Sequence, residues 1–425
     1  MRLLYSLAWG LSLPFALLRL WLRGRQEPGY RRHIGERFGA AGGVGDHPAC
    51  LWVHAVSAGE TRAAEPLIRA LLSAYPQHQL LLTHMTATGR ATGASLFADV
   101  APRLRQVYLP YDINWMMRRF LRHHRPQLCI LMETEVWPNL IAQCGKQAIP
   151  VCLVNARLSE KSLGKARRLA ALMVPAAHAL AIVGAQSQPD AERLLALGMT
   201  RMSITGNMKF DVTPPPLMAQ HGAALRERLG RRQIFLCAST RDGEESLILD
   251  AWMRLTTSAP EKPLLIITPR HPQRFDEVAQ LLMQRGLRTV RRSQLESDSS
   301  PMSDIDVLLG DSMGEMYMYY AAADLAFVGG SLVALGGHNL IEAFAMGKPA
   351  LTGPHTFNFS EITDQAIAAG AAVRVADADA MLAQALALLA KTEPRHSMGQ
   401  AAHAFFLHHQ GATARTMALL QTFIK

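Results

Sequence analysis

A chain of 425 residues exceeds what a single hydrophobic core usually serves, so we expect two domains. Hydrophobic residues make up 49% and charged residues 18% of the sequence, a composition that leaves room for no more than local disorder. The net charge of +10 favours anionic partners: nucleic acid, an anionic membrane surface or phosphorylated substrates.

The five cysteines are scattered along the chain, and their spacing is not that of a zinc or thioredoxin site. Most lie inside apolar runs, so we expect reduced core cysteines in a cytosolic protein. The sixteen histidines include no His-Glu-x-x-His pattern, and the sequence therefore specifies no metal site.

The first predicted element is an apolar segment, residues 3–18, which is followed by an arginine-rich tract, residues 19–37. We assign residues 1–24 to a membrane anchor. The apolar segment is somewhat short against the roughly 20 residues of a spanning helix, so we expect it to span the bilayer or to lie in one leaflet. A cleaved signal peptide would carry its positive charge before the apolar run, whereas the arginines of this chain follow the run, so we expect an anchor rather than a signal peptide. The positive-inside rule places the remaining chain in the cytoplasm, where the tract either binds anionic head groups or forms a solvated basic face.

Short apolar runs then alternate with segments of helical length and spacing, a pattern typical of βαβ units in a parallel sheet. The runs of the first series are 51–56, 80–83, 106–109, 128–132, 151–154 and 179–183. Consecutive prolines, Pro214-Pro215-Pro216, interrupt the pattern, because they can continue neither a helix nor a central strand. The runs of the second series are 234–238, 264–268, 307–310, 325–328, 349–351 and 372–375.

The predicted fold class is therefore α/β, with two Rossmann-like domains whose parallel sheets face a central cleft. The first domain is assigned to residues 25–212 and the second to residues 213–400. Residues 401–425 are expected to form a helix that packs back on the first domain.

In the first domain, a short strand ends in the small-residue turn His54-Ala55-Val56-Ser57-Ala58-Gly59-Glu60. Open α/β sheets bind their ligands at this end of their strands. An acid at a helix start is favoured by the macrodipole and should stay ionised. Glu60 is then a base, a hydrogen-bond acceptor or merely a helix-start residue, and His54 is expected to be a satisfied near-core histidine.

Two further residues of the first domain carry charge near predicted strand ends. Glu133 follows the apolar run 128–132, and Lys209 lies where the domain gives way to the proline-rich linker. Under one interpretation Glu133 orients a substrate and Lys209 binds a phosphate or a leaving group. Under the other, the two residues form a structural ion pair.

In the second domain, a strand enters the glycine-rich stretch 328–337, and a helix follows. This order predicts a phosphate site at the helix start, although such glycines also make simple tight turns. Glu342, one turn into the helix, is placed to accept hydrogen bonds from vicinal hydroxyls such as those of a ribose. Three other loops, 239–241, 268–271 and 310–315, bring charged or hydroxyl groups to the same sheet edge, so we predict a nucleotide site there.

Together these stretches resemble the 3-deoxy-D-manno-oct-2-ulosonic acid (Kdo) transferases. The motifs in question occur in order, nearly from end to end: HAVSAGE, METEVWPN, NARLS, GNMKFD, TPRHPQRF, GDSMGEM, ADLAFVGGSL, GGHNLIEA and GPHTFNF. The resemblance implies a GT-B fold and an inverting, metal-independent glycosyl transfer that needs no cofactor. The implied donor is CMP-Kdo, and the implied acceptor is a lipid A precursor (lipid IVA) in lipopolysaccharide inner-core biosynthesis.

The resemblance also implies roles for individual residues. Glu60 matches the general base that deprotonates the acceptor glucosamine hydroxyl, and Glu133 and Lys209 match residues that stabilise the transition state. The residues that match CMP-contacting segments are Pro269, Arg270, Met313, Gly314, Glu315, Asn339, Leu340, Ile341 and Glu342. Leu340 stands where the family commonly has proline; because proline at a helix start lacks only a free N–H, leucine should be tolerated.

Finally, the resemblance places the protein on the cytoplasmic face of the inner membrane, with anionic lipids as further partners and without nucleic acid. Two alternatives remain open. One is another nucleotide-sugar enzyme of the same fold, such as a hexosaminyltransferase or an epimerase, and the other is a non-catalytic, membrane-tethered nucleotide-binding protein. Mono-, bi- and multifunctional Kdo transferases share these motifs, so the number of Kdo residues added also stays open.

Overall fold

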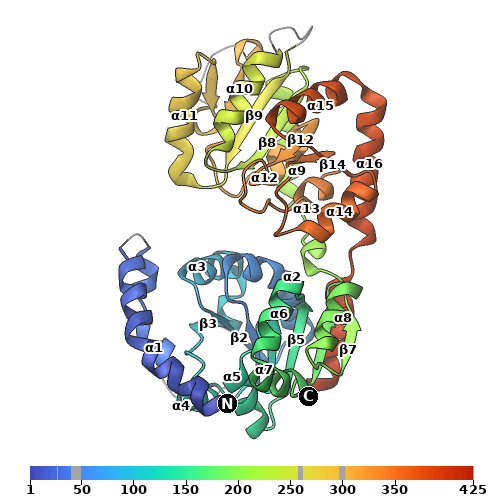
Figure 1. Ribbon diagram of the computed structural model, residues 1–425. Coiled ribbons are helices and arrows are strands. Elements are labelled where there is room, and N and C mark those ends of the chain that lie inside the picture. The colour runs from blue at the N-terminus through green and yellow to red at the C-terminus, as the bar shows by residue number, and fades with distance from the viewer. Residues whose placement is uncertain (26, 40–48, 257–261, 296–301, 425) are drawn as a thin grey trace. The chain divides into compact units, whose positions relative to one another are not determined.

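The computed structural model describes residues 1–25, 27–39, 49–256, 262–295 and 302–424. The chain forms two compact units, each built on a parallel sheet (Figure 1). Unit 1 comprises Met1–Val212 and His409–Lys425, and unit 2 comprises Thr213–His408. The chain therefore crosses between the units twice.

The sheet of unit 1 has the strand order β3-β2-β1-β4-β5-β6-β7, and all its neighbouring strands are parallel. Its strands are β1 (Cys50–His54), β2 (Gln79–His84), β3 (Leu104–Tyr108), β4 (Leu128–Met132), β5 (Val151–Ala156), β6 (Ile182–Ala185) and β7 (Met202–Ile204). The chain builds outward from β1 in one direction and then from β4 in the other. The carboxyl ends of β1 and β4 thus flank the switch point at which open α/β sheets bind ligands.

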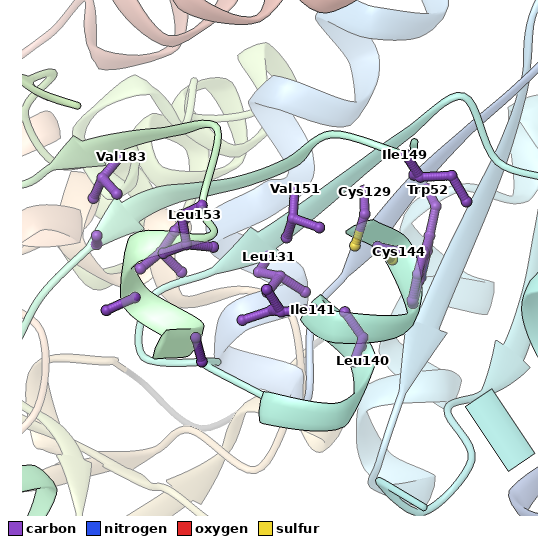
Figure 2. Packing of buried hydrophobic residues seen from close by; sticks show 14 of the residues in the cluster. Trp52, Cys129, Leu131, Leu140, Ile141, Cys144, Ile149, Val151, Leu153 and Val183 are labelled. Atoms are coloured by element: carbon purple, nitrogen blue, oxygen red, sulfur yellow. The ribbon is translucent and has the colours of Figure 1, made fainter. Parts of the chain in front are cut away.

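Both faces of this sheet are covered, so its strands are continuous apolar runs rather than alternating ones. Trp52, Leu131 and Leu153 pack on one face with Leu140 and Ile141 (Figure 2). Their neighbours along the same strands pack on the opposite face. The helices of unit 1 are α1 (Arg2–Arg23), α2 (Ala58–Ala74), α3 (Ala87–Leu96), α4 (Asn114–His124), α5 (Pro138–Lys146), α6 (Glu160–Arg168), α7 (Ala170–His178), α8 (Gln188–Ala196) and α17 (Ala412–Leu420). Short 3-10 turns are η1 (Pro28–Arg31), η2 (Ile34–Phe38), η3 (Ala98–Arg103) and η4 (Met208–Asp211).

Helix α1 covers the predicted anchor and is, among the described helices, the one long and apolar enough to cross a membrane by length and composition. One side of it, including Trp9 and Leu13, packs on Tyr111 and Met116. Ser6 Oγ also accepts a hydrogen bond of 2.9 Å from Asn139 Nδ2. The helix is therefore attached along one side to the body of unit 1.

The sheet of unit 2 has the order β10-β11-β9-β8-β12-β13-β14 and is likewise parallel, with its switch point between β8 and β12. Its strands are β8 (Ile234–Thr240), β9 (Leu264–Pro269), β10 (Thr289–Arg291), β11 (Val307–Leu309), β12 (Leu325–Val328), β13 (Ala350–Thr352) and β14 (Ala372–Arg374). Its helices are α9 (Pro216–Leu229), α10 (Glu244–Thr256), α11 (Phe275–Gln284), α12 (Met316–Ala322), α13 (Ile341–Ala345), α14 (Ser360–Ala368), α15 (Ala378–Ala390) and α16 (Thr392–His408), with the 3-10 turns η5 (Pro272–Arg274), η6 (Arg292–Gln294) and η7 (Met302–Asp304).

The predicted start of the C-terminal segment at residue 401 is wrong. Residue 401 lies inside α16, whose Ala402 and Phe405 are buried in unit 2. The helix continues because Gly411, with φ +90°, is the next residue that favours a break. The chain then returns to unit 1, where Gly411 N donates a hydrogen bond of 2.7 Å to Asp211 and α17 packs on α2; the 3-10 turn η8 (Gln421–Phe423) follows.

Candidate functional site

Glu60 lies in the first turn of α2, directly beyond β1. Ser57 is the N-cap, and its Oγ accepts a hydrogen bond of 3.4 Å from Glu60 N, while the Glu60 carboxylate accepts one from Val56 N. This reciprocal pattern is close to a capping box. Glu60 is thus a helix-start residue, as one interpretation has it, and its carboxylate is held at the switch point by that role.

The Glu60 carboxyl is not in the state that the helix dipole alone would suggest. Burial raises its pKa to about 8, and the nearby carboxylates of Glu135 and Glu133 add to the effect. The expectation that the group stays fully ionised is therefore wrong, because burial and like charges outweigh the dipole. A carboxyl with such a pKa changes its protonation state near neutral pH, and its deprotonated form is a stronger base than an ordinary carboxylate.

Glu133 immediately follows β4, the strand that neighbours β1. It is buried, and its backbone has φ +54°, a left-handed conformation that costs on the order of 1–3 kcal/mol in a residue other than glycine. Its two carboxylate oxygens accept hydrogen bonds of 3.0 Å from Lys209 Nζ and 2.9 Å from Arg157 Nε. Burial alone would raise the pKa of Glu133, but the two cations outweigh burial and lower it.

The predicted partners Glu133 and Lys209 are therefore brought together, although 76 residues separate them in the sequence. Sequence reasoning missed Arg157 and Glu135. Arg157 directly follows β5, so the rule that ligands bind at strand ends is a signal that points to it. Glu135 Oε2 accepts a hydrogen bond of 2.7 Å from Trp137 Nε1, and burial raises its pKa.

His54 belongs to the core of unit 1. Its ring is fully buried, and Nδ1 lies 2.8 Å from Thr83 Oγ1. Burial lowers its pKa to about 3, so the imidazole is neutral. The near-core placement of His54 is confirmed, but the ring is satisfied at Nδ1 alone, because the buried Nε2 has no hydrogen-bond partner in the described part of the chain.

In unit 2, the residues matched to CMP contacts lie at the carboxyl edge of the sheet, at a strand end, in loops and in the first turn of α13. Pro269 ends β9, the segment Met313–Glu315 follows β11, and the segment Asn339–Glu342 follows β12. Arg270 N donates a hydrogen bond of 2.9 Å to Thr240 O, which ties the loops after β8 and β9 together.

The side chains of these residues differ in what they offer a ligand. Met313 is exposed, and Glu315 accepts a hydrogen bond of 3.1 Å from Arg292. Leu340 and Ile341, in contrast, are buried, with exposed fractions of 1% and 2%. Only the backbone of these two residues is available to a nucleotide.

In the glycine-rich turn after β12, which precedes the helix start predicted to bind phosphate, the backbone N–H groups already have protein acceptors. Those of Gly330, Ser331 and Leu332 all donate to the side chain of Glu244. The following helix α13 has only five residues. The N–H groups of the turn are therefore occupied by a protein carboxylate, and the phosphate site predicted at the start of the helix stays a prediction.

Cationic and imidazole side chains gather at this edge of unit 2. Burial lowers the pKa of His338 to about 4, and the nearby Arg270, Arg241 and His271 contribute to the shift. Because His338 is neutral while the arginines are charged, the group has a net positive charge and suits an anionic ligand. Within the described ranges, no three His, Cys, Asp or Glu side chains are grouped in a way that could hold a metal ion.

Comparison with known proteins gives the family. Residues 32–212 match the family described as 3-Deoxy-D-manno-octulosonic-acid transferase (kdotransferase), and residues 299–405 match Glycosyl transferases group 1. The chain is 46% identical over 428 residues to a 3-deoxy-D-manno-octulosonic acid transferase of Bordetella pertussis, with 99% of each chain covered. The chain belongs to the Kdo transferase family. A Haemophilus influenzae transferase of the same description is 36% identical, over 97% of this chain and 96% of its own.

The resemblance seen in the motifs is thus confirmed, and this Kdo transferase is a glycosyltransferase of lipopolysaccharide biosynthesis. Membership in this enzyme family excludes the alternative that the chain is a non-catalytic nucleotide-binding protein. Among solved structures, the UDP-GlcNAc 2-epimerase from Neisseria meningitidis matches with a TM-score of 0.59 and 15% identity, over 88% of this chain and 100% of that one. A glycosyltransferase from Rickettsia africae matches with a TM-score of 0.58 and 10% identity, over 90% and 100%. These likenesses show the fold alone, which is of GT-B type.

Proposed function

We propose that this Kdo transferase moves Kdo from CMP-Kdo to a lipid A precursor, lipid IVA, with inversion and with Glu60 as general base. The observation that carries the proposal is the placement of Glu60 at the switch point of unit 1 with its pKa raised to about 8. The Glu60 carboxylate takes the proton of an acceptor glucosamine hydroxyl. The hydroxyl oxygen then bonds to the anomeric carbon of Kdo, while the bond from that carbon to the phosphate oxygen breaks and CMP leaves with the electron pair.

Glu133 and Lys209 support the same step from the neighbouring strand ends. The buried Glu133 carboxylate holds the Lys209 ammonium and the Arg157 guanidinium at the edge of the sheet. Both are fixed donors that need no rearrangement when negative charge develops on the transferring group. This arrangement joins the two interpretations, because the structural ion pair is also what positions the cations.

Unit 2 is the proposed donor-binding unit. Arg241 and Arg270 balance the charge of the CMP phosphate, and their neighbours His271 and His338 offer hydrogen bonds. Glu342, in the first turn of α13, accepts hydrogen bonds from the ribose hydroxyls. In this scheme the cationic side chains take the place of a metal ion, and no cofactor takes part.

The proposed location is the cytoplasmic face of the inner membrane, with α1 lying in one leaflet. One side of α1 is attached to unit 1, and the other side exposes an apolar stripe that includes Leu7, Leu11 and Phe15. Arginines at the end of the helix and the exposed Trp115 of α4 suit an interface with anionic lipid head groups. A helix attached along its length cannot extend alone across the bilayer.

Mass spectrometry of the product formed from CMP-Kdo and a purified tetra-acylated lipid A precursor tests the overall proposal. The expected result is an acceptor heavier by one or more whole Kdo residues, and the mass gives their number. Calorimetry with CMP and UDP provides a separate check, because the proposal requires CMP to bind more tightly than UDP. Tighter binding of UDP and an unmodified acceptor would contradict it.

The pH dependence of the reaction reports on Glu60. Since the base acts only when deprotonated and burial raises its pKa to about 8, kcat/KM should rise as the pH increases from 6 through about 8 and level off roughly one pH unit above the pKa. Glu135 contributes to this shift, so Glu135→Gln should move the rising limb to lower pH. A profile that is flat between pH 6 and pH 9 contradicts the assignment, because it would indicate a group with an ordinary carboxyl pKa.

Membrane binding should depend on the apolar stripe of α1. We expect the double variant Leu11→Glu/Phe15→Glu to bind phosphatidylglycerol-containing vesicles at least roughly tenfold more weakly, because each buried apolar side chain contributes about 1.5–3 kcal/mol. Vesicle flotation measures the effect. Leu195→Glu is the matched control, since Leu195 is an exposed leucine on α8. Equal losses in both variants would show that α1 is not the binding surface.

A further inference from the structure

The carboxylate of Glu244 is completely surrounded by backbone donors. Its Oε1 accepts hydrogen bonds of 2.9 Å each from the N–H groups of Ser331 and Leu332. Its Oε2 accepts bonds of 2.6 Å from Gly330 N and 2.9 Å from Arg241 N. The side chain is buried, with an exposed fraction of 0%. A carboxylate has about four acceptor sites, and here backbone N–H groups fill them all.

The four donors come from two loops that meet at the switch point of the unit 2 sheet. Arg241 directly follows β8 and Glu244 begins α10, whereas the turn from Gly330 to Leu332 follows β12. Strands β8 and β12 are neighbours, and the strand order reverses between them. In an open α/β sheet a nucleotide binds between such loops. Glu244 accepts hydrogen bonds from both loops and so connects the two sides of the expected nucleotide site.

The close fit of the β12 loop depends on this carboxylate. A Cβ added to Gly329 would lie 2.9 Å from Glu244 Oε2 and 2.8 Å from Ser239 O, so only glycine allows the approach. Gly330 has φ +72°, which glycine adopts without strain. Ser331 Oγ donates to Val328 O and accepts from Gly353 N, both at 2.8 Å. Protein groups thus fix the turn through both its N–H groups and its serine side chain.

The turn after β12 also positions residues that face the proposed donor. Gly330 O accepts a hydrogen bond of 2.7 Å from Gly337 N. The ring of His338 packs directly over Gly330, where an added Cβ would lie 3.0 Å from Nε2. The residue after His338 is Asn339, which begins the segment matched to CMP contacts. On the other loop, the same carboxylate fixes the backbone of Arg241.

We propose that Glu244 is a positioning residue for the nucleotide donor. Its carboxylate occupies the N–H groups of the turn after β12 and thereby holds the two loops in their binding conformation. The donor phosphate is then bound by the side chains of Arg241 and its cationic neighbours. This inference rests on the proposed function, in which unit 2 binds CMP-Kdo. It differs from the common use of such turns, in which the ligand phosphate itself takes the backbone N–H groups.

Glu245 provides a matched control. It is buried to the same degree, but its Oε1 accepts hydrogen bonds of 2.7 Å each from Thr240 Oγ1 and Arg274 Nη1. None of the hydrogen bonds found in the described part of the chain joins Glu245 to the turn after β12. Loss of its charge should lower stability without releasing that turn.

The first experiment compares Glu244→Gln and Glu245→Gln by calorimetry with CMP and by steady-state kinetics. A glutamine amide places an NH₂ group against N–H donors, so Glu244→Gln should weaken CMP binding at least roughly tenfold, a change of about 1.4 kcal/mol. It should raise the KM for CMP-Kdo and lower kcat much less. Glu245→Gln should lower Tm about as much as Glu244→Gln does, yet it should keep the Kd for CMP within about twofold of the wild-type value. A folded Glu244→Gln protein with an unchanged Kd, or an equal loss of affinity in Glu245→Gln, overturns the proposal.

The second experiment needs no variant and covers the case in which Glu244→Gln does not fold. Amide hydrogen exchange is measured on the wild-type full chain with and without CMP. We expect the amides of Gly330, Ser331 and Leu332 to be protected already without CMP and to change little when it binds. Amides that exchange freely and gain protection only with CMP would show that the phosphate uses them, and the proposal would then be wrong. Wild-type protein that binds CMP but transfers no Kdo would instead reject the proposed function.

Discussion

Replacing Glu60 by glutamine should lower kcat by about 100- to 10,000-fold, the usual contribution of a positioned general base. Glutamine has the same shape, and its carbonyl oxygen can still accept the hydrogen bond from Val56 N that completes the start of α2. The fold should therefore be retained. The amide cannot take the proton of the acceptor hydroxyl, so the loss should fall on turnover. Transfer of Kdo to a lipid A precursor, followed by mass spectrometry, measures it.

Two controls separate catalysis from folding. Calorimetry should show that Glu60→Gln binds CMP like the wild type, because CMP is assigned to unit 2. Glu65→Gln, in the same helix, removes one partly buried partner of Arg69, which keeps Asp99 as a second partner, and should leave the rate nearly unchanged. Wild-type turnover in a folded, CMP-binding Glu60→Gln protein would show that the base is another group.

Replacing Glu133 by glutamine should have the largest effect on stability. The change leaves Lys209 and Arg157 without the buried carboxylate that both now contact. Breaking a buried ion pair costs about 3–5 kcal/mol, and we expect the lower end because Arg157 is half-exposed. The strained backbone of Glu133, φ +54°, would remain without the interactions that offset it. Urea unfolding measures the change.

Lys209→Met and the double variant show whether the pair also acts in transfer. Lys209→Met should cost less stability than Glu133→Gln, because Arg157 still balances Glu133. It should lower kcat/KM by about 100-fold, as removal of one stabilising charge does. In the double variant the stability losses should be less than additive. Additive losses together with a wild-type rate in Lys209→Met would mean that the residues neither couple nor take part in the reaction.

Most strands could be predicted from the sequence because strands buried on both faces are uninterrupted apolar runs. The run 128–132, for example, has the bounds of β4. Strands β7 and β10 escape this criterion, because each is a three-residue strand at a sheet edge and contains polar or charged residues. The C-terminal boundary was misplaced because the sequence around residue 401 contains no signal that ends α16.

The candidate site was predictable in position but not in its interactions. Glu60 and Glu133 follow strand ends, and the topology of an open sheet brings such positions together. The hydrogen-bond partners and the pKa of a side chain at such a strand end depend on residues that are far away in the sequence. Glu244 takes the N–H of Gly330 across 86 residues, and no local pattern shows that the turn is filled. The raised pKa of Glu60 likewise depends on burial and on carboxylates from the loop after β4.

The double crossing of the chain has a consequence for synthesis on the ribosome. Unit 2, residues 213–408, is contiguous, so all of it has been made before residues 409–424 emerge. Unit 1 lacks part of its core until then, because Ala412 and Leu420 of α17 complete one face of its sheet. Asp211 also lacks the hydrogen bond from Gly411 N until that residue has been made. The unit that holds Glu60 is therefore completed last. A nascent chain stalled before α17 would contain all of unit 2 but would lack the helix that completes the core of unit 1.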